Sequence, residues 1–562
     1  MPETSAVPAK SLNTKVSHPP MPPVRGFLEH PSAAAVMAKQ QQNSQGFNHP
    51  VCYTPSCVWL GKQLRAILNP LVDPCDNFNE HVCGRFDSVS DSDSTIDAYD
   101  RAVQDDLVRG VNTMESSSLS PDSARKKAAD LALGCFSRHS SPNLQHDVLD
   151  SFMKDEQLNV QKVEGDLDES YESLLSLHVR LSFHLPARGL FHITPSTKPG
   201  ELQILLDTST VPGQAQFLRS MPRGDGAKYL GTLQPVDFRT TTAAKVSIRG
   251  LKSTFFAEAL AAHTPYGPDT IVEVDQRLLQ TLENLIDAVG KQDLYFFTSW
   301  NVLRELGPYV DNQVFRLYDQ PHAYALCIRK VRLVMAVPLA ATTFYVENTA
   351  QSYLEAMTRK LVYCVAKNAS SWLRKLPDPY SSPPSMSVIV GYPASEDTDL
   401  KMDQKYNVYP VHNLSFGVFL SDWLVAAQRR STHLNLSDVS FDPFVLDTVV
   451  SRDGSYVALP AAVVHVMYRY DAVDAFKHGA IGHMIAKRFI QRLSSTGKWP
   501  RECSQPAGSK ATSVPENLLA YQCVADGLQS DLTLNSSAAM WLPMHLHLTP
   551  WRQLFTMDAE LR

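Results

Sequence analysis

The stretch from Ala475 to Trp499, AFKHGAIGHMIAKRFIQRLSSTGKW, predicts one amphipathic helix. Its apolar residues recur every fourth position between Ile481 and Leu493, which is the spacing of one helical face. Lys487 and Gln491 lie on a separate flank, one helical turn apart. Taken alone, the stretch is typical of a helix that packs one side against a core. The motifs before it give it a more specific meaning.

Two motifs precede this helix: Leu459–Val464 reads LPAAVV, and Gly479–Gly482 reads GAIG. They resemble the FPAGIL and GxIG motifs that lead into the zinc-binding helix of the neprilysin and endothelin-converting-enzyme family of zinc metalloendopeptidases. In that family the zinc motif HExxH begins after four intervening residues. The resemblance therefore places the zinc motif of this chain at Lys487–Gln491, which reads KRFIQ.

The residues at Lys487–Gln491 do not suit zinc. In HExxH the two histidines lie one turn apart and bind one ion, while the glutamate polarises the attacking water. Here Lys487 and Gln491 stand at the two ligand positions, and Arg488 stands at the position of the general base. One unit charge at about 4 Å from a like charge costs roughly 4 kcal/mol at an effective dielectric constant of 20, and a divalent ion doubles that cost. We therefore expect no zinc and no other cofactor here.

The resemblance assigns further site positions. Asp447-Thr448-Val449-Val450 match the Asn-Ala-x-Tyr strand that holds an extended substrate as an added strand in the family. Gln522 stands where the family has its third metal ligand, a glutamate. Asp526 is retained, and the family uses this carboxylate to orient a ligand histidine.

These assignments predict how the vacated site is held together. We expect Lys487 to pair with Asp526, and Arg488 to reach Asp447 or solvent. A relocated metal site is not indicated, because His478 and His483 are five residues apart and therefore about 140° apart around a helix.

The region Val51–Phe86 contains four of the nine cysteines and opens with C-x-T-x-x-C, followed by DPCDNF and CG. It resembles the opening of the same family. Cys52 and Cys57 can bridge locally, and because zinc-ribbon spacing is absent we expect a disulfide. The resemblance also implies a disulfide between Cys135 and Cys327. Cys364 is expected to be a buried thiol. The sequence leaves open the partners of the remaining cysteines, Cys75, Cys83, Cys503 and Cys523.

Composition excludes several classes of partner. The chain has 562 residues, 44% of them hydrophobic and 20% charged, and a net charge of -6 with acidic and basic residues interspersed. It has no basic stripe for nucleic acid and no polybasic membrane patch. The cysteines favour an oxidising, extracellular compartment. Four Asn-x-Ser sequons agree with that compartment, at Asn368, Asn413, Asn435 and Asn535.

The N-terminal residues 1–50 predict a disordered tail without a signal sequence or membrane span. Either the chain lacks the family's N-terminal anchor, or the sequence begins downstream of it. Residues 51–440 are expected to form a neprilysin-like helical region, and residues 441–562 a degenerate catalytic region that lacks the family's C-terminal tail. Helices are expected at Asp122–Cys135, Ile271–Val289, Leu294–Leu306, Tyr324–Leu339 and Phe416–Arg430, with a strand at Ser387–Pro393.

The sequence thus predicts a mostly α-helical, two-lobed, neprilysin-like shell with a thermolysin-like (zincin) catalytic lobe that carries a small β-sheet and is truncated at its C-terminus. We expect a catalytically inactive homologue, at the cell surface or secreted, that binds peptides or proteins. Two alternatives stay open. One is an active zinc metalloendopeptidase whose site lies elsewhere, and the other is a truncated, non-functional product.

Overall fold

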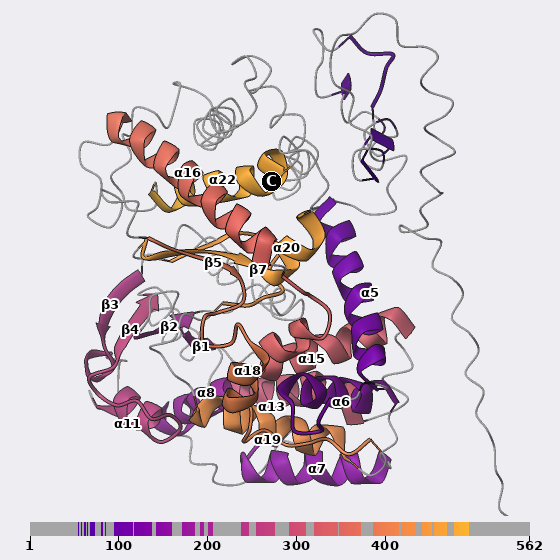
Figure 1. Cartoon of the computed structure of the whole chain (residues 1–562). Coiled ribbons are helices and arrows are strands. Elements are labelled where there is room, and N and C mark those ends of the chain that lie inside the picture. The colour runs from indigo at the N-terminus through magenta and orange to yellow at the C-terminus, as the bar shows by residue number, and fades with distance from the viewer. Residues whose placement is uncertain are drawn as a thin grey trace, which may run out of the picture.

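The computed structural model describes residues 95–115, 119–137, 142–159, 171–185, 192–195, 200–205, 238–246, 254–275, 291–310, 320–346, 348–372, 386–414, 417–433, 441–451, 454–468 and 477–493, with residue 117 and single residues or short runs between 54 and 85. The described part is mostly helical and contains two small β-sheets (Figure 1). None of its helices is both long enough and apolar enough to span a bilayer.

The helices are α5 (Thr95–Glu115), α6 (Ala124–Ser137), α7 (Pro142–Asp155), α8 (Tyr171–His184), α11 (Phe255–Ala261), α13 (Lys291–Val310), α15 (Gln320–Ala341), α16 (Asn348–Trp372), α18 (Asp399–Lys405), α19 (Phe419–Thr432), α20 (Ala461–Met467) and α22 (His483–Leu493), with a 3₁₀ turn η1 (Ala243–Lys245) and a π-helical turn η3 (His478–Gly482). Helices α6, α13, α15 and α19 lie where the apolar periodicity predicts them.

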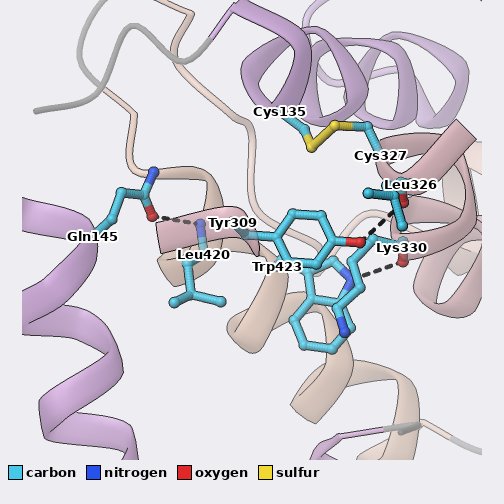
Figure 2. Close-up of a disulfide and its surroundings, with 8 residues drawn as sticks. All are labelled: Cys135, Gln145, Tyr309, Leu326, Cys327, Lys330, Leu420 and Trp423. Carbon is cyan, nitrogen blue, oxygen red and sulfur yellow. Dashed lines mark hydrogen bonds between the residues drawn. A yellow bond between two sulfur atoms is a disulfide. The ribbon is translucent and has the colours of Figure 1, made fainter. Parts of the chain in front are cut away.

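Helices α5, α6, α7, α13, α15 and α19 pack into a helical layer with one large core, and most of this layer lies in the lower half of Figure 1. A disulfide joins Cys135 of α6 to Cys327 of α15, as the resemblance implies (Figure 2). Beside it the indole Nε1 of Trp423 donates to the carbonyl of Lys330 at 2.8 Å. The buried Lys330 ammonium lies 4.4 Å from the Trp423 ring and 3.0 Å from Glu305 Oε1. The core of this layer thus includes a paired charge.

A four-stranded mixed sheet interrupts the region that the sequence predicts as helical. Its strands are β1 (His192–Pro195), β2 (Glu201–Leu205), β3 (Phe238–Thr242) and β4 (Ile271–Asp275), in the order β1-β2-β4-β3. The helix expected at Ile271–Val289 is therefore wrong at its start. Ile271-Val272-Glu273-Val274 is rich in β-branched residues, which favour a strand, and both valines are buried in the core under this sheet.

A second, three-stranded sheet supports the region of interest. It consists of β5 (Ser387–Gly391), β6 (Val449–Val450) and β7 (Tyr456–Pro460), in the order β5-β7-β6. β5, which the sequence predicts, pairs with β7 in parallel, and β6 pairs with β7 antiparallel. Helices α16 and α22 lie side by side next to this sheet, in the upper half of Figure 1. Their apolar residues form one core with β5, β7 and α20.

Candidate functional site: the polar flank of helix α22

Helix α22 is the helix predicted from the opening stretch, and it begins directly after the π-helical turn η3. Ile481, Ile485 and Phe489 are all buried in the core shared with α16 and β7, as the apolar stripe predicts. The opposite flank is polar: Lys487 and Gln491 are half-buried, and Arg488 is exposed. The side chains at the expected zinc positions therefore lie on the outward side of the helix.

An ion pair joins α22 to the segment that leads into β6. The Arg488 guanidinium donates from Nε to Asp447 Oδ2 at 2.6 Å, and Nη2 contacts the same oxygen. Its Nη1 donates to Gln491 Oε1 at 3.1 Å. Arg488, at the expected position of the general base, is thus hydrogen-bonded to two residues. One is Asp447, where a substrate-holding residue is expected, and the other is Gln491, where a metal ligand is expected. The sequence predicts that Arg488 reaches either Asp447 or solvent, and the structure shows the contact with Asp447.

Backbone hydrogen bonds fix the Asp447 end of this pair. Asp447 Oδ1 accepts from the backbone N–H of Thr448 at 2.8 Å, so both carboxylate oxygens are engaged. Thr448 itself is buried, and Val449 and Val450 follow as β6, opposite Ala458 and Val457 of β7. The segment that the resemblance matches to the family's substrate-holding strand therefore forms a strand, and the acidic residue before it is paired with Arg488.

These residues do not fit a zinc ion. A guanidinium stays protonated in proteins and offers only donors, and a lysine ammonium has no lone pair to give. Arg488 occupies the polar flank of α22 together with Lys487, and among the described residues it is hydrogen-bonded to one carboxylate, that of Asp447. Among the residues that the structure describes, no group of three or more histidine, cysteine, aspartate or glutamate side chains is placed to hold a metal. The side chains on the polar flank of this helix therefore form an ion pair and offer no set of metal ligands.

The segment before α22 also contains a buried lysine, Lys477, that the sequence does not single out. Lys477 is buried, with its ammonium 4.8 Å from the ring of Tyr353 on α16 and 5.3 Å from the ring of Tyr468 after α20. His478, the first residue of η3, and His483, the first residue of α22, are both buried. No local motif signals these contacts of Lys477, because one of the two rings, Tyr353, comes from α16, more than 100 residues earlier in the chain.

Several predicted site residues lie outside the described residues: Gln522, Asp526, Cys52, Cys57, Cys75, Cys83, Cys503, Cys523, Asn435 and Asn535. The Lys487–Asp526 pair therefore stays a prediction. Of the two remaining sequons, Asn413 is exposed in the segment between α18 and α19, whereas Asn368 lies within α16. Cys364, expected to be buried, is only half-buried on α16, because it lies at the edge of the core rather than inside it.

Comparison with known proteins gives a match in structure only. No protein-family model and no curated protein matches the sequence. The zinc metalloprotease Zmp1 of Mycobacterium tuberculosis, solved with an inhibitor, is 13% identical, with a TM-score of 0.54 over 86% of this chain and 90% of that chain. PepO of Lactobacillus rhamnosis is 13% identical, with a TM-score of 0.53 over 85% and 90%. A Haemonchus galactose-containing glycoprotein complex gives 10% identity and a TM-score of 0.58 over 86% and 90%.

These likenesses establish the fold. The chain shares its fold with the zinc metalloprotease Zmp1 and with PepO along most of its length, which confirms the predicted mostly helical fold class and, at the level of the fold, the resemblance. At such low identity the shared architecture does not extend to the chemistry of the site. That chemistry has to be argued from the residues around α22.

Proposed function

We propose that this protein is a non-catalytic counterpart of the zinc metalloendopeptidases whose fold it shares, and that it binds peptides or protein segments without cleaving them. The observation that carries this proposal is the hydrogen-bonded set of Arg488, Asp447 and Gln491 on the polar flank of α22. Metal-assisted hydrolysis needs a Lewis acid and a group that accepts a proton from water. Neither Lys487 nor Arg488 provides either function at neutral pH.

Peptide binding is supported by β6. This strand pairs with β7 on one side and is the last strand of its sheet among the described residues. An edge strand offers main-chain donors and acceptors to an extended peptide, and this kind of recognition needs no catalytic group. A chain that loses the metal can therefore keep the binding.

A location outside the cell, secreted or at the cell surface, is part of the proposal. The buried Cys135–Cys327 disulfide is of the kind that persists in oxidising compartments. Asn413 presents a sequon on an exposed segment. One structure with the same fold is described as part of a galactose-containing glycoprotein complex, and such glycans belong to secreted and surface proteins.

Elemental analysis and a peptidase assay test this proposal. The full chain, purified without added chelator and with zinc supplied during expression, should contain much less than one zinc per chain. It should also leave fluorogenic oligopeptides uncut. Stoichiometric zinc, together with cleavage that a chelator abolishes, would establish the alternative that the fold likeness to Zmp1 and PepO favours, an active zinc metalloendopeptidase. Failure to detect the intact chain from its native transcript would favour the truncated, non-functional product.

A further inference from the structure

The helices beside the vacated site carry an excess of positive charge. α16 and α22 lie side by side (Figure 1) and together contain six basic residues and one acidic residue, in a chain whose net charge is -6. The basic residues are Arg359, Lys360, Lys367, Lys487, Arg488 and Arg492, and the acidic residue is Glu355. By sequence the two helices thus carry a net charge of +5, six basic residues minus one acidic residue, in a chain whose net charge is -6.

Arg488 keeps hydrogen-bonding capacity although it is paired. A guanidinium has five N–H donors, and the contacts to Asp447 and Gln491 use three of them, one on each nitrogen. The Arg488 side chain is 44% exposed and that of Asp447 is 30% exposed, so both remain in contact with solvent. A second carboxylate can therefore reach the guanidinium and share it with Asp447 or displace that residue.

Arg488 is also close to β6, the edge strand of its sheet among the described residues. Asp447 precedes Thr448 and the β6 pair Val449–Val450, and α22 packs against β6. A peptide that added a strand beside β6 would run past Arg488. The reason is that the ion pair holds Arg488 at Asp447, two residues before β6 begins. Main-chain pairing and a cationic side chain are thus available to the same ligand.

We propose that β6 and α22 bind an extended acidic peptide segment, with Arg488 reading a carboxylate of that segment. This inference rests on the proposed peptide-binding function and adds the chemical class of the peptide. Main-chain pairing selects a polypeptide, and the cationic helices select acidic side chains. Asp447 acts as an internal competitor, because it occupies the guanidinium when no ligand carboxylate is present.

Binding of labelled peptides to the full chain tests the proposal. Three extended peptides of equal length serve as probes, with valine alternating with glutamate, glutamine or lysine. Fluorescence anisotropy should give the tightest binding for the glutamate peptide, about fivefold or more over the glutamine peptide, and none for the lysine peptide. Raising the salt from about 0.05 to about 0.5 M should remove most of the difference between the glutamate and glutamine peptides.

Variants separate Arg488 from the general charge of the helices. Asp447→Asn removes the competitor, so the glutamate peptide should bind several-fold more tightly while the glutamine peptide is unchanged. Arg488→Gln should weaken only the glutamate peptide, by about fivefold. Arg125→Gln is the matched control, because Arg125 of α6 makes an exposed ion pair with Asp399 of α18 in the helical layer. That variant should leave all three affinities unchanged.

The possible failures are distinguishable. If none of the peptides binds, the proposed peptide-binding function itself is wrong. If glutamate and glutamine peptides bind equally well, that function stands and the acidic specificity is wrong. An unchanged affinity of Asp447→Asn for the glutamate peptide would overturn the role given to Arg488. Because the peptide series and the salt dependence use the unmodified chain, the specificity is tested even if a variant fails to fold.

Discussion

His178 of α8 is a buried histidine whose protonation should oppose folding. It is 1% exposed, and burial lowers the pKa of its imidazole from 6.5 to about 4. Between these two values the unfolded chain binds a proton that the folded chain does not. Stability should therefore be lost as the pH falls from 6.5 to 4, by about 3 kcal/mol from this residue.

Urea unfolding across that pH range measures this loss. His178→Gln should flatten the decrease between pH 6.5 and pH 4, although it lowers stability at neutral pH by disturbing a buried contact. His433→Gln is the control, because His433 is an exposed residue that ends α19. If His178→Gln and the unmodified chain lose stability in parallel, the low pKa is wrong.

Single residues also show what sequence reasoning could predict about the site. The Arg488–Asp447 contact could be anticipated, because motifs before α22 and before β6 place both residues at known positions of one fold. The environment of Lys477 could not, since its aromatic partners Tyr353 and Tyr468 come from α16 and from the end of α20. Local patterns identify positions in a fold, and they carry no information about which distant side chains surround those positions.

Among the elements, helix α6 is fixed to other parts of the chain at two adjacent residues, Gly134 and Cys135. Gly134 packs closely against His412. A Cβ at this position would lie 2.0 Å from Nε2 of His412, a buried ring whose Nδ1 is 2.7 Å from Asp422 Oδ2. Gly134→Ala should destabilise the protein by about 1–3 kcal/mol, because this clash outweighs the helix propensity of alanine.

Gly307 of α13 is the matched control for this substitution, because nothing lies within 4 Å of an added Cβ there. Gly307→Ala should change stability by less than about 1 kcal/mol, because the helix propensity of alanine is offset by the position of residue 307 directly before Pro308. Chemical denaturation of both variants measures the two effects. Equal effects at the two sites would show that His412 does not fill the space beside α6.

Cys135 is the second held residue of α6, and its disulfide to Cys327 closes a chain separation of 192 residues. Cross-linking residues so far apart removes much of the freedom of the unfolded chain. The double variant Cys135→Ala, Cys327→Ala should therefore lose about 2–5 kcal/mol of unfolding free energy. Cys364→Ala, at a half-buried cysteine on α16, is the control and should cost less. An unchanged urea midpoint in the double variant would contradict the expectation.

Elements were predictable where one periodicity dominates. The helices α13, α15 and α19 carry apolar residues at helical spacing over several turns, and the expected ranges overlap those observed. At Ile271–Asp275 the alternating, β-branched start runs on into a stretch with amphipathic helical spacing, and the longer pattern decided the assignment wrongly. β4 is a strand because β2 and β3 pair with it on both sides, and those pairings are long-range.

At the scale of the whole molecule, two of the three cores meet in α20. Ala461 and Ala462 belong to the core of the helical layer, whereas Val463 and Val464 belong to the core shared by α16, β5, β7 and α22. The expected boundary at residue 440 also falls between strands that pair, since Ser387 of β5 lies opposite Tyr456 of β7. The regions 51–440 and 441–562 therefore share both a sheet and two cores.

This sharing predicts that neither region folds alone. Without β7, α20 and α22, fragment 51–440 would expose the apolar side of α16, including Leu354 and Leu361, which are buried in the intact chain. Burying one such side chain contributes about 2 kcal/mol, so exposing five of them costs about 10 kcal/mol, comparable to a typical domain's whole stability of about 5–15 kcal/mol. The five are Leu354, Met357, Leu361, Val362 and Val365. Produced separately, the fragments should lack a cooperative thermal transition and should be degraded by a low concentration of protease.

The control is the intact chain with a protease site inserted between residues 434 and 440 and cut after folding. Because the cores are already formed in that protein, the two pieces should stay associated through size-exclusion chromatography and should unfold together in one transition. A cooperative, protease-resistant fragment 51–440 would show instead that the helical region is an independent domain and that α20 only touches it. That result would also require β5 to be stable without β7. Among the described residues of its sheet, β5 pairs with β7 alone, and a single unpaired strand is not stable by itself.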